Sequence, residues 1–505
     1  MKERQQLPTI SARNATHPWV ALFLICVPTV VLGLDMSVLY LALAHIAASL
    51  HTTAVQELWI LDIYPLMLAG FLIPMGGMSD RWGNRRILLI GSSAFMVLSA
   101  IASMTSTAPT LIIVRAALGI AGAALMPATL GLISDLFPDS QQRRRAISIW
   151  TSAFMAGFAL GPIVGGALLE FLGWEAIFLM AVPVMLPLLI AGPVVFPKSL
   201  QSDVQKQYDW LSSLLFLAAI LPLVYGLKEC VIGETKLNAV LALSGGLIAG
   251  SAFIIRQLKS THPLLDLPLI RSNAALATAL LILLLGPATI GGLTLFIPQY
   301  LQLAYGLSAV AAGTFIAPAS AGLIVSALLS PPLAKKGGSS GVIIGGGFLV
   351  IAVGLVTIAF GVHLSPVWVI VGLVVVYFGC GPFDALGTDI VVASAPEGKS
   401  ASAGAAAETA VELGMGLGIA LFGTLGTAVY QYRLTGHLMA CGTECSVIER
   451  ATSSFSGVMT ETSSLALRDH ASAAFASGLA TVAGSAVLLA LILSALSFVF
   501  LRKTA

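Results

Sequence analysis

Charged residues are scarce in this sequence. Asp, Glu, Lys and Arg make up 10% of its 505 residues, whereas hydrophobic residues make up 57% and the mean hydropathy is +0.96. Soluble domains carry about a quarter charged residues, so this chain cannot cover a water-facing surface of ordinary size. The composition excludes a soluble enzyme and predicts an integral membrane protein. The lack of short alternating strands with regular turns favours helices over a barrel.

Other features are missing as well. Five Cys are too few for a disulfide framework. Cys26, Cys230 and Cys380 lie in or beside apolar runs and are interpreted as small core residues, whereas Cys441 and Cys445 share a polar segment and could form a disulfide. The net charge of +2 gives no reason to expect a nucleic-acid partner. No complete Walker-type loop is present, which removes ATP as the direct energy source, and no His lies clearly within a helix core, which argues against a histidine proton relay.

Long apolar runs are what the sequence has in abundance. A helix needs about 20 apolar residues to cross the roughly 30 Å hydrocarbon layer. By that measure the sequence predicts an all-α polytopic membrane protein with fourteen spans, at about 19–44, 57–78, 86–106, 110–134, 146–169, 175–197, 209–228, 237–256, 275–298, 308–330, 341–361, 366–392, 403–429 and 472–501. The seventh and eighth are the least regular, because Lys228, Glu229, Glu234 and Lys236 lie between them.

The distribution of Lys and Arg predicts the direction of these helices. Outside the helices, most of them fall on the same side as the polar N-terminal segment, as Arg81, Arg143 and Lys335 do, and few fall on the other side. Because positively charged loops stay in the cytoplasm, both chain ends are expected to be cytoplasmic. The bias supports an even number of helices and fixes parity better than number.

Two related loops indicate that the chain consists of two halves. Gly76–Arg86 follows the second helix, and the degraded version Pro331–Gly338 holds the corresponding place in the second half. Two parallel repeats of six helices are typical of transporters. The predicted parts are a cytoplasmic N-terminus at 1–18, a six-helix bundle at 19–197, two inserted helices at 198–256, helices nine to thirteen at 257–429, an extracytoplasmic loop at 430–471, and helix fourteen with a cytoplasmic tail at 472–505.

Four segments combine residue types that simple membrane anchoring does not require. The loop after helix two contains Gly76, Asp80, Arg81, Gly83 and Arg85. Its glycines permit a tight turn, and its carboxylate can bind a neighbouring helix end in one conformation and release it in another, although a positively charged turn is the plainer interpretation. Helix four contains Arg115, which costs at least about 2.5 kcal/mol inside hydrocarbon and needs a carboxylate or a wet cavity unless it snorkels to the surface.

Helices five and one complete the set. Helix five contains Pro162, which kinks it, among small residues that let another helix approach closely. Those small residues are Gly157, Gly161, Gly165 and Gly166. Helix one contains Leu34-Asp-Met-Ser-Val-Leu-Tyr-Leu-Ala-Leu-Ala44, with Asp35 inside the bilayer.

Together these segments resemble the major facilitator superfamily, and within it the fourteen-helix drug:proton antiporters typified by multidrug and quaternary-ammonium exporters. The family patterns are G-x-x-x-D-R-x-G-R-K/R, R-x-x-x-G, G-x-x-x-G-P-x-x-G-G, which marks antiporters, and L-D-x-T-V-x-x-x-A-L-P; Trp59–Tyr64 adds to the match. The sequence departs at Asn84, where a basic residue is usual, at Ser37, which replaces Thr, and at Ala44, which replaces Pro. The resemblance covers essentially the whole chain and implies two six-helix bundles with two extra helices between them.

Ionisable residues inside the bilayer are the candidates for proton coupling and substrate binding. At 1.5 Å per residue, Asp35, Asp62 and Arg115 lie at similar depth, so a cluster of two carboxylates and one arginine is geometrically possible. The alternatives are a structural ion pair of Asp35 with Arg115, and an Asp62 that belongs to the helix entrance.

Helices thirteen and twelve hold the remaining intramembrane carboxylates. Glu408 and Glu412 are four residues apart and share a helix face, so their charges would repel and at least one is expected to be protonated near neutral pH. That property suits a proton carrier, although Glu408 could instead cap its helix or snorkel. Asp384 and Asp389 follow the helix-weakening Gly379-Cys-Gly-Pro382 and are assigned a structural role.

Together with these residues, the resemblance implies an antiporter that exports lipophilic cations, such as quaternary ammonium compounds and dyes, in exchange for protons across a bacterial inner membrane. It is expected to be no enzyme, to hold no cofactor or metal, to use the proton gradient within membrane lipid, and to function as a monomer. Residues that could offer aromatic faces to a cation, or simply pack, are Tyr40, Trp59, Tyr64, Trp150 and Phe154. The alternative is export of a natural metabolite by the same exchange, since a fold does not name a substrate. A pore or membrane sensor would leave the helix-five pattern unexplained.

The polar stretch 431–470 is predicted to be the longest outer loop. It connects helix thirteen, with its two glutamates, to helix fourteen. Because it lies beyond the exit side, we expect it to gate or guide substrate release and to be dispensable for folding.

Overall fold

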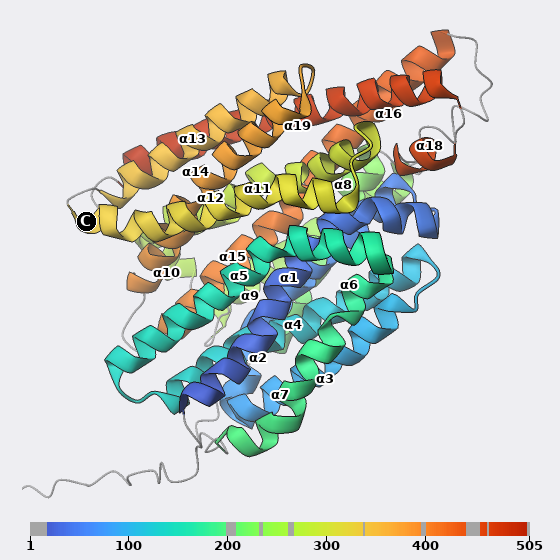
Figure 1. Ribbon diagram of the computed structural model, residues 1–505. Coiled ribbons are helices and arrows are strands. Elements are labelled where there is room, and N and C mark those ends of the chain that lie inside the picture. The colour runs from blue at the N-terminus through green and yellow to red at the C-terminus, as the bar shows by residue number, and fades with distance from the viewer. Residues whose placement is uncertain are drawn as a thin grey trace, which may run out of the picture.

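The computed structural model describes residues 18–197, 209–231, 236–260, 267–336, 339–394, 400–440, 455–461 and 464–501. In these ranges every regular element is a helix (Figure 1). Fourteen helices are long and apolar enough to cross a membrane. The predicted all-α polytopic fold with fourteen spans is therefore confirmed. Cys441 and Cys445 lie outside the described residues.

The first bundle contains six spans. They are α1 (Pro18–Leu50), α2 (Ala54–Trp82), α3 (Asn84–Ser103), α4 (Ala108–Leu136), α5 (Ser140–Leu172), and a sixth span made of α6 (Glu175–Leu179) and α7 (Ala181–Val195). A capping box between Thr53 and Gln56 begins α2, and Gly83 with a φ of 92° permits the turn into α3. We call the membrane side of Pro18 the near side and that of Leu50 the far side.

The second bundle contains six spans as well. They are α11 (Ala274–Gln299) with the π-helical turn η2 (Tyr300–Ala304), α12 (Ala309–Lys335), α13 (Ser340–Gly361), α14 (Pro366–Ala393), α15 (Ser400–Gly418) continued by the π-helical turn η3 (Ile419–Gly423) and α16 (Thr424–Ala440), and α19 (Leu465–Phe500). Figure 1 shows the two bundles one above the other, the first in blue to green and the second in yellow to red. A short helix, α18 (Phe455–Glu461), precedes α19.

The thirteenth span is longer than the sequence predicted. Its helix continues to Ala440, and α19 already begins at Leu465, so the expected loop at 430–471 is largely helical where it is described. Tyr430, Leu434 and Leu438 recur every four residues and are buried, because α16 packs along α19. This apolar stripe maintains the helix beyond the point where polar residues suggested its end.

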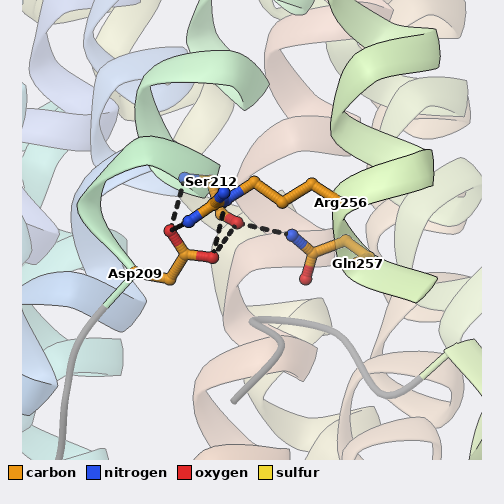
Figure 2. A network of polar contacts seen from close by, with 4 residues as sticks. All are labelled: Asp209, Ser212, Arg256 and Gln257. Carbon is orange, nitrogen blue, oxygen red and sulfur yellow. Dashed lines mark hydrogen bonds and ion pairs between the residues drawn. The ribbon is translucent and has the colours of Figure 1, made fainter. Parts of the chain in front are cut away.

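The inserted helices form a hairpin of α8 (Trp210–Val231) and α9 (Lys236–Lys259), followed by the short α10 (Leu267–Ser272). Figure 2 shows the near-side end of the hairpin, where Arg256 of α9 donates to both carboxylate oxygens of Asp209 at 2.7–3.0 Å. Ser212 donates to Asp209 at 2.6 Å and accepts from Gln257 at 2.8 Å. Burial alone would raise the pKa of Asp209, but the hydrogen bonds from Arg256 and Ser212 outweigh it and lower that pKa.

The glycines of α5 permit close contact with two helices. A Cβ on Gly161 or Gly165 would overlap Ser37 or Val38 of α1, and one on Gly166 would lie 2.6 Å from the Ala309 carbonyl oxygen of α12. The close approach that the small residues of helix five predict is therefore present. Through it, α5 packs on α1 within the first bundle and on α12 of the second bundle.

Candidate functional site

A cavity of about 770 Å³ lies between the two bundles. Helices α1, α2, α4 and α5 line it from the first bundle, and α11, α12, α14 and α15 from the second. Its charged lining residues are Arg115, Asp384, Glu408 and Glu412, and its aromatic lining residues are Tyr40, Tyr64, Trp150, Phe154, Phe158, Tyr377 and Phe383.

The cavity is accessible from the near side. Its lining extends toward the near-side ends of α5 and α12, to Ile147 and Leu328, and includes the exposed polar residues Ser148, Thr151 and Ser152. On the far side, hydrogen bonds connect the bundles. Gln302 donates to the Leu41 carbonyl oxygen at 2.8 Å, and the Val310 amide donates to Glu170 at 3.2 Å. The structure is therefore open on one side and closed on the other.

The structure brings Asp35 and Arg115 together. Arg115 Nη1 donates to Asp35 Oδ2 at 2.9 Å, and the arginine is only 2% exposed. The guanidinium also lies 4.4 Å from the centre of the Tyr64 ring. Because Arg115 is buried, it does not snorkel to the membrane surface. Its charge is instead matched by Asp35 at the wall of the cavity.

Asp62 does not join this ion pair, so the three-residue cluster that equal depth allowed does not form. Leu61, Tyr64 and Pro65 of α2 line the cavity, and Asp62 faces another direction on the same helix. Its Oδ2 lies 2.6 Å from Nζ of Lys228 on α8. The sequence placed Lys228 in an outer segment, whereas the structure buries it completely in the last turns of a transmembrane helix. The sequence could predict the depth of Asp62 in the membrane, but not the rotation of α2 that turns Asp62 away from the cavity.

Three carboxylates line the cavity from the second bundle. Glu408 and Glu412 of α15 both do so, as their four-residue spacing predicted. Asp384 of α14 lines it too, although the sequence suggested a structural role, and Asp389 does not. The small residues of Gly379-Cys-Gly-Pro382 indicated a close helix contact near Asp384. A Cβ on Gly381 would overlap Ser326, so α14 touches α12 one turn before Asp384. Since Asp35 matches Arg115, these carboxylates make the cavity acidic.

Aromatic side chains cover much of the remaining wall. Tyr40, Tyr64, Trp150 and Phe154 line the cavity, as the sequence allowed. Trp59 does not line it, because its ring covers the Lys228 ammonium at 3.8 Å. Aromatic faces beside carboxylates suit organic cations.

The loop between α2 and α3 contacts two other helices of the first bundle. Asn84, at the position where a basic residue is usual, donates to Asp135 of α4 at 2.9 Å and accepts from Ser79 at 2.8 Å. Arg85 donates to the Pro193 carbonyl oxygen of α7. Asp80 and Arg81 are exposed on the near side. A neutral amide thus satisfies the carboxylate of α4 at this position.

The described part of the chain has no group of three or more His, Cys, Asp or Glu residues arranged to hold a metal ion. The chemistry that the cavity offers is therefore that of carboxylates, one matched guanidinium, hydroxyls and aromatic rings.

Comparisons with known proteins identify the family to which this chain belongs. The model of the Major Facilitator Superfamily matches residues 25–419. The chain is 37% identical to the multidrug efflux pump LfrA of Mycolicibacterium smegmatis, over 98% of each chain. It is 31% identical to the methyl viologen resistance protein SmvA of Salmonella typhimurium, over 86% of this chain and 87% of that one.

Solved structures show the same fold. A bacterial homologue of the human lysosomal transporter Spinster superposes with a TM-score of 0.65 at 16% identity, over 96% of this chain and 97% of that one. A peptide transporter of the POT type gives 0.62 at 16% identity, over 95% of each chain. The chain therefore belongs to the major facilitator superfamily, where it groups with multidrug exporters, and it is a multi-pass membrane transporter and not an enzyme.

Proposed function

We propose that this transporter exports lipophilic organic cations in exchange for protons. The observation that carries the proposal is the charge of the cavity. Asp384, Glu408 and Glu412 face a space of about 770 Å³ in which the cation Arg115 is already matched by Asp35. An organic cation gains electrostatic attraction there, and the aromatic walls cover its apolar part.

The same carboxylates support exchange with protons. A carboxylate that binds a proton loses the charge that attracts a cation, so proton and substrate compete for one group. Glu408 and Glu412 lie on one face of α15, where two negative charges repel, so holding a proton on one of them is favourable. Protonation of Asp35 would weaken its ion pair with Arg115 and so loosen the contact between α1 and α4.

The relatives agree with this substrate class. The names of two of them refer to multidrug efflux and to resistance against methyl viologen, which is a dication. We infer that the near side is cytoplasmic, in an inner membrane, because it collects the positive loops. The described conformation is then the one that receives substrate from the cytoplasm, and the monomer suffices because the cavity lies within one chain.

Purified protein in liposomes tests the proposal directly. A monovalent and a divalent quaternary ammonium compound are added, and proton release and uptake of each compound are recorded for wild type and for Asp35→Asn, Asp384→Asn, Glu408→Gln and Glu412→Gln. Asp389→Asn is the matched control, since Asp389 is on the same helix as Asp384 but is exposed and outside the cavity lining. Wild type and the control should exchange both compounds for protons.

The variants should separate the roles. Asp35→Asn is expected to lose proton-coupled transport by at least about tenfold, equivalent to about 1.4 kcal/mol. The other three should lose more affinity for the divalent than for the monovalent compound, because each removes a charge from the cavity. Transport without proton movement, or equal transport of neutral analogues, would contradict the proposal.

A further inference from the structure

A second buried ion pair lies outside the cavity. Nζ of Lys228 on α8 is 2.6 Å from Oδ2 of Asp62 on α2, and both side chains are 0% exposed. The ammonium also lies 3.8 Å from the centre of the Trp59 ring, one turn before Asp62. Carboxylate and ring together replace the water that an ammonium loses on burial. Lys228 is therefore a matched counter-charge for Asp62.

This ion pair lies where the inserted hairpin meets both bundles. Helix α8 packs against α2 of the first bundle and against η3 and α16 of the second. Leu66 of α2, Val224 of α8 and Ala420 of η3 form a buried apolar cluster. Leu66 is one turn after Asp62, and Val224 is one turn before Lys228, so cluster and ion pair are adjacent layers of one contact.

The two contacts of α8 differ in kind. The ion pair resists displacement of α8 from α2, since a displaced lysine would leave two unpaired charges buried away from water. The contact with Ala420 of η3 is apolar, so displacement there leaves no charge unpaired. The rest of the hairpin follows α8, because Arg256 and Gln257 of α9 bind Asp209 and Ser212 at its near-side end (Figure 2).

We propose that Lys228 is a positioning residue for transport. Its ammonium pairs with Asp62 throughout the cycle, so that Asp62 remains charged, outside the cavity, and transfers no proton. The ion pair keeps the α8–α9 hairpin attached to α2 while α2 moves relative to η3. The hairpin thereby acts as part of the first bundle and slides on the second.

Paired substitutions test this role. The variants are Asp62→Asn, Lys228→Met and the double variant that carries both changes. Lys236→Met is the matched control, because Lys236 is a lysine of the same hairpin and is exposed. For each, the thermal midpoint of the purified protein is measured without substrate, and maximal efflux rate, KM and pH dependence of efflux are measured in vesicles. The thermal measurement does not depend on the proposed substrate or on proton coupling.

Each single variant leaves one buried charge unpaired, so both should lower the thermal midpoint and reduce the maximal rate by at least about tenfold, with KM within about twofold because the cavity is untouched. The double variant removes both charges and should regain most of the thermal stability and efflux, with the pH dependence of wild type. The proposal is overturned if the double variant is as defective as Asp62→Asn, if its pH profile shifts, or if Lys228→Met behaves like the control.

Discussion

At the scale of single residues, the structure explains a departure from the family pattern through a partner on another helix. The Asn84 amide packs directly against Gly131 of α4, and a Cβ at position 131 would overlap it. Only glycine at position 131 leaves room for this amide. Both positions thus form one unit with Asp135 and Ser79. The loop of α2 and α3 is held to α4 by this fit and not by an additional cation.

Gly131→Ala should therefore impair the protein through Asn84. The added methyl group would displace the amide from Asp135 and Ser79, at a cost of about 1–3 kcal/mol for a carboxylate left without its donor. Thermal midpoint and efflux rate should both fall. Asn84→Ala combined with Gly131→Ala has no overlap, and it should be no worse than Asn84→Ala alone. A Gly131→Ala protein with the thermal midpoint and efflux rate of wild type would contradict this prediction.

Residue-level prediction from sequence succeeded where a pattern fixed both depth and face. The spacing of Glu408 and Glu412 gave their common face. The cost of a buried Arg115 required a carboxylate or a wet cavity, and the structure gives it both, Asp35 as a partner and a place in the cavity wall. It failed for Asp62, because depth alone does not tell which neighbour a helix face meets. It also failed for Lys228, since polar neighbours along the chain hid the fact that this lysine has a buried partner.

At the scale of elements, α18 changes the interpretation of the polar stretch before the last span. Phe455 is 3% exposed and stacks on Phe475 at 4.0 Å, with Tyr430 at 5.7 Å. Helix α18 contacts α1 and η2 besides α19, so it touches both bundles on the far side. The expectation that residues 431–470 are dispensable for folding conflicts with this packing. A seven-residue helix with two buried apolar side chains is too short for a periodic signal to reveal it in a sequence.

Removing the aromatic ring of Phe455 should therefore destabilise the protein. Phe455→Ala is expected to cost about 3–5 kcal/mol, as for other buried phenylalanines, and to slow efflux because α18 bridges the closed far side. Tyr432→Ala is the control, since Tyr432 lies on α16 and is 80% exposed. Thermal midpoint and efflux are compared for both. A Phe455→Ala protein as stable as the control would reduce α18 to a tether.

At the scale of the whole molecule, closure of the far side depends on small residues that let α5 and α12 touch. A Cβ on Gly313 of α12 would overlap the Pro162 carbonyl oxygen of α5, and one on Gly166 of α5 would lie 2.6 Å from the Ala309 carbonyl oxygen. Sequence indicated the close approach of helix five, but the second half of the contact, Gly313, lies in no recognised pattern. Alternating access requires this contact to open while the near side closes, so any group that wedges it favours the state open to the far side.

Gly313→Ala places such a wedge and should shift the equilibrium between the two states. A shift of about 1.4 kcal/mol changes their ratio about tenfold. Ser148 lines the cavity on the near side, so a Ser148→Cys reporter, in a chain without native cysteines, should react more slowly with an impermeant thiol reagent from that side, by up to about tenfold. Gly322→Ala is the matched control. Gly322 is also on α12, but the nearest atom to an added Cβ, the Val374 carbonyl oxygen of α14, would be 3.4 Å away. Equal labelling in the two variants would show that the contact between Gly313 and Pro162 does not hold the far side closed. Closure would then rest on the other far-side contacts, which include the hydrogen bonds of Gln302 and Glu170 and the packing of α18.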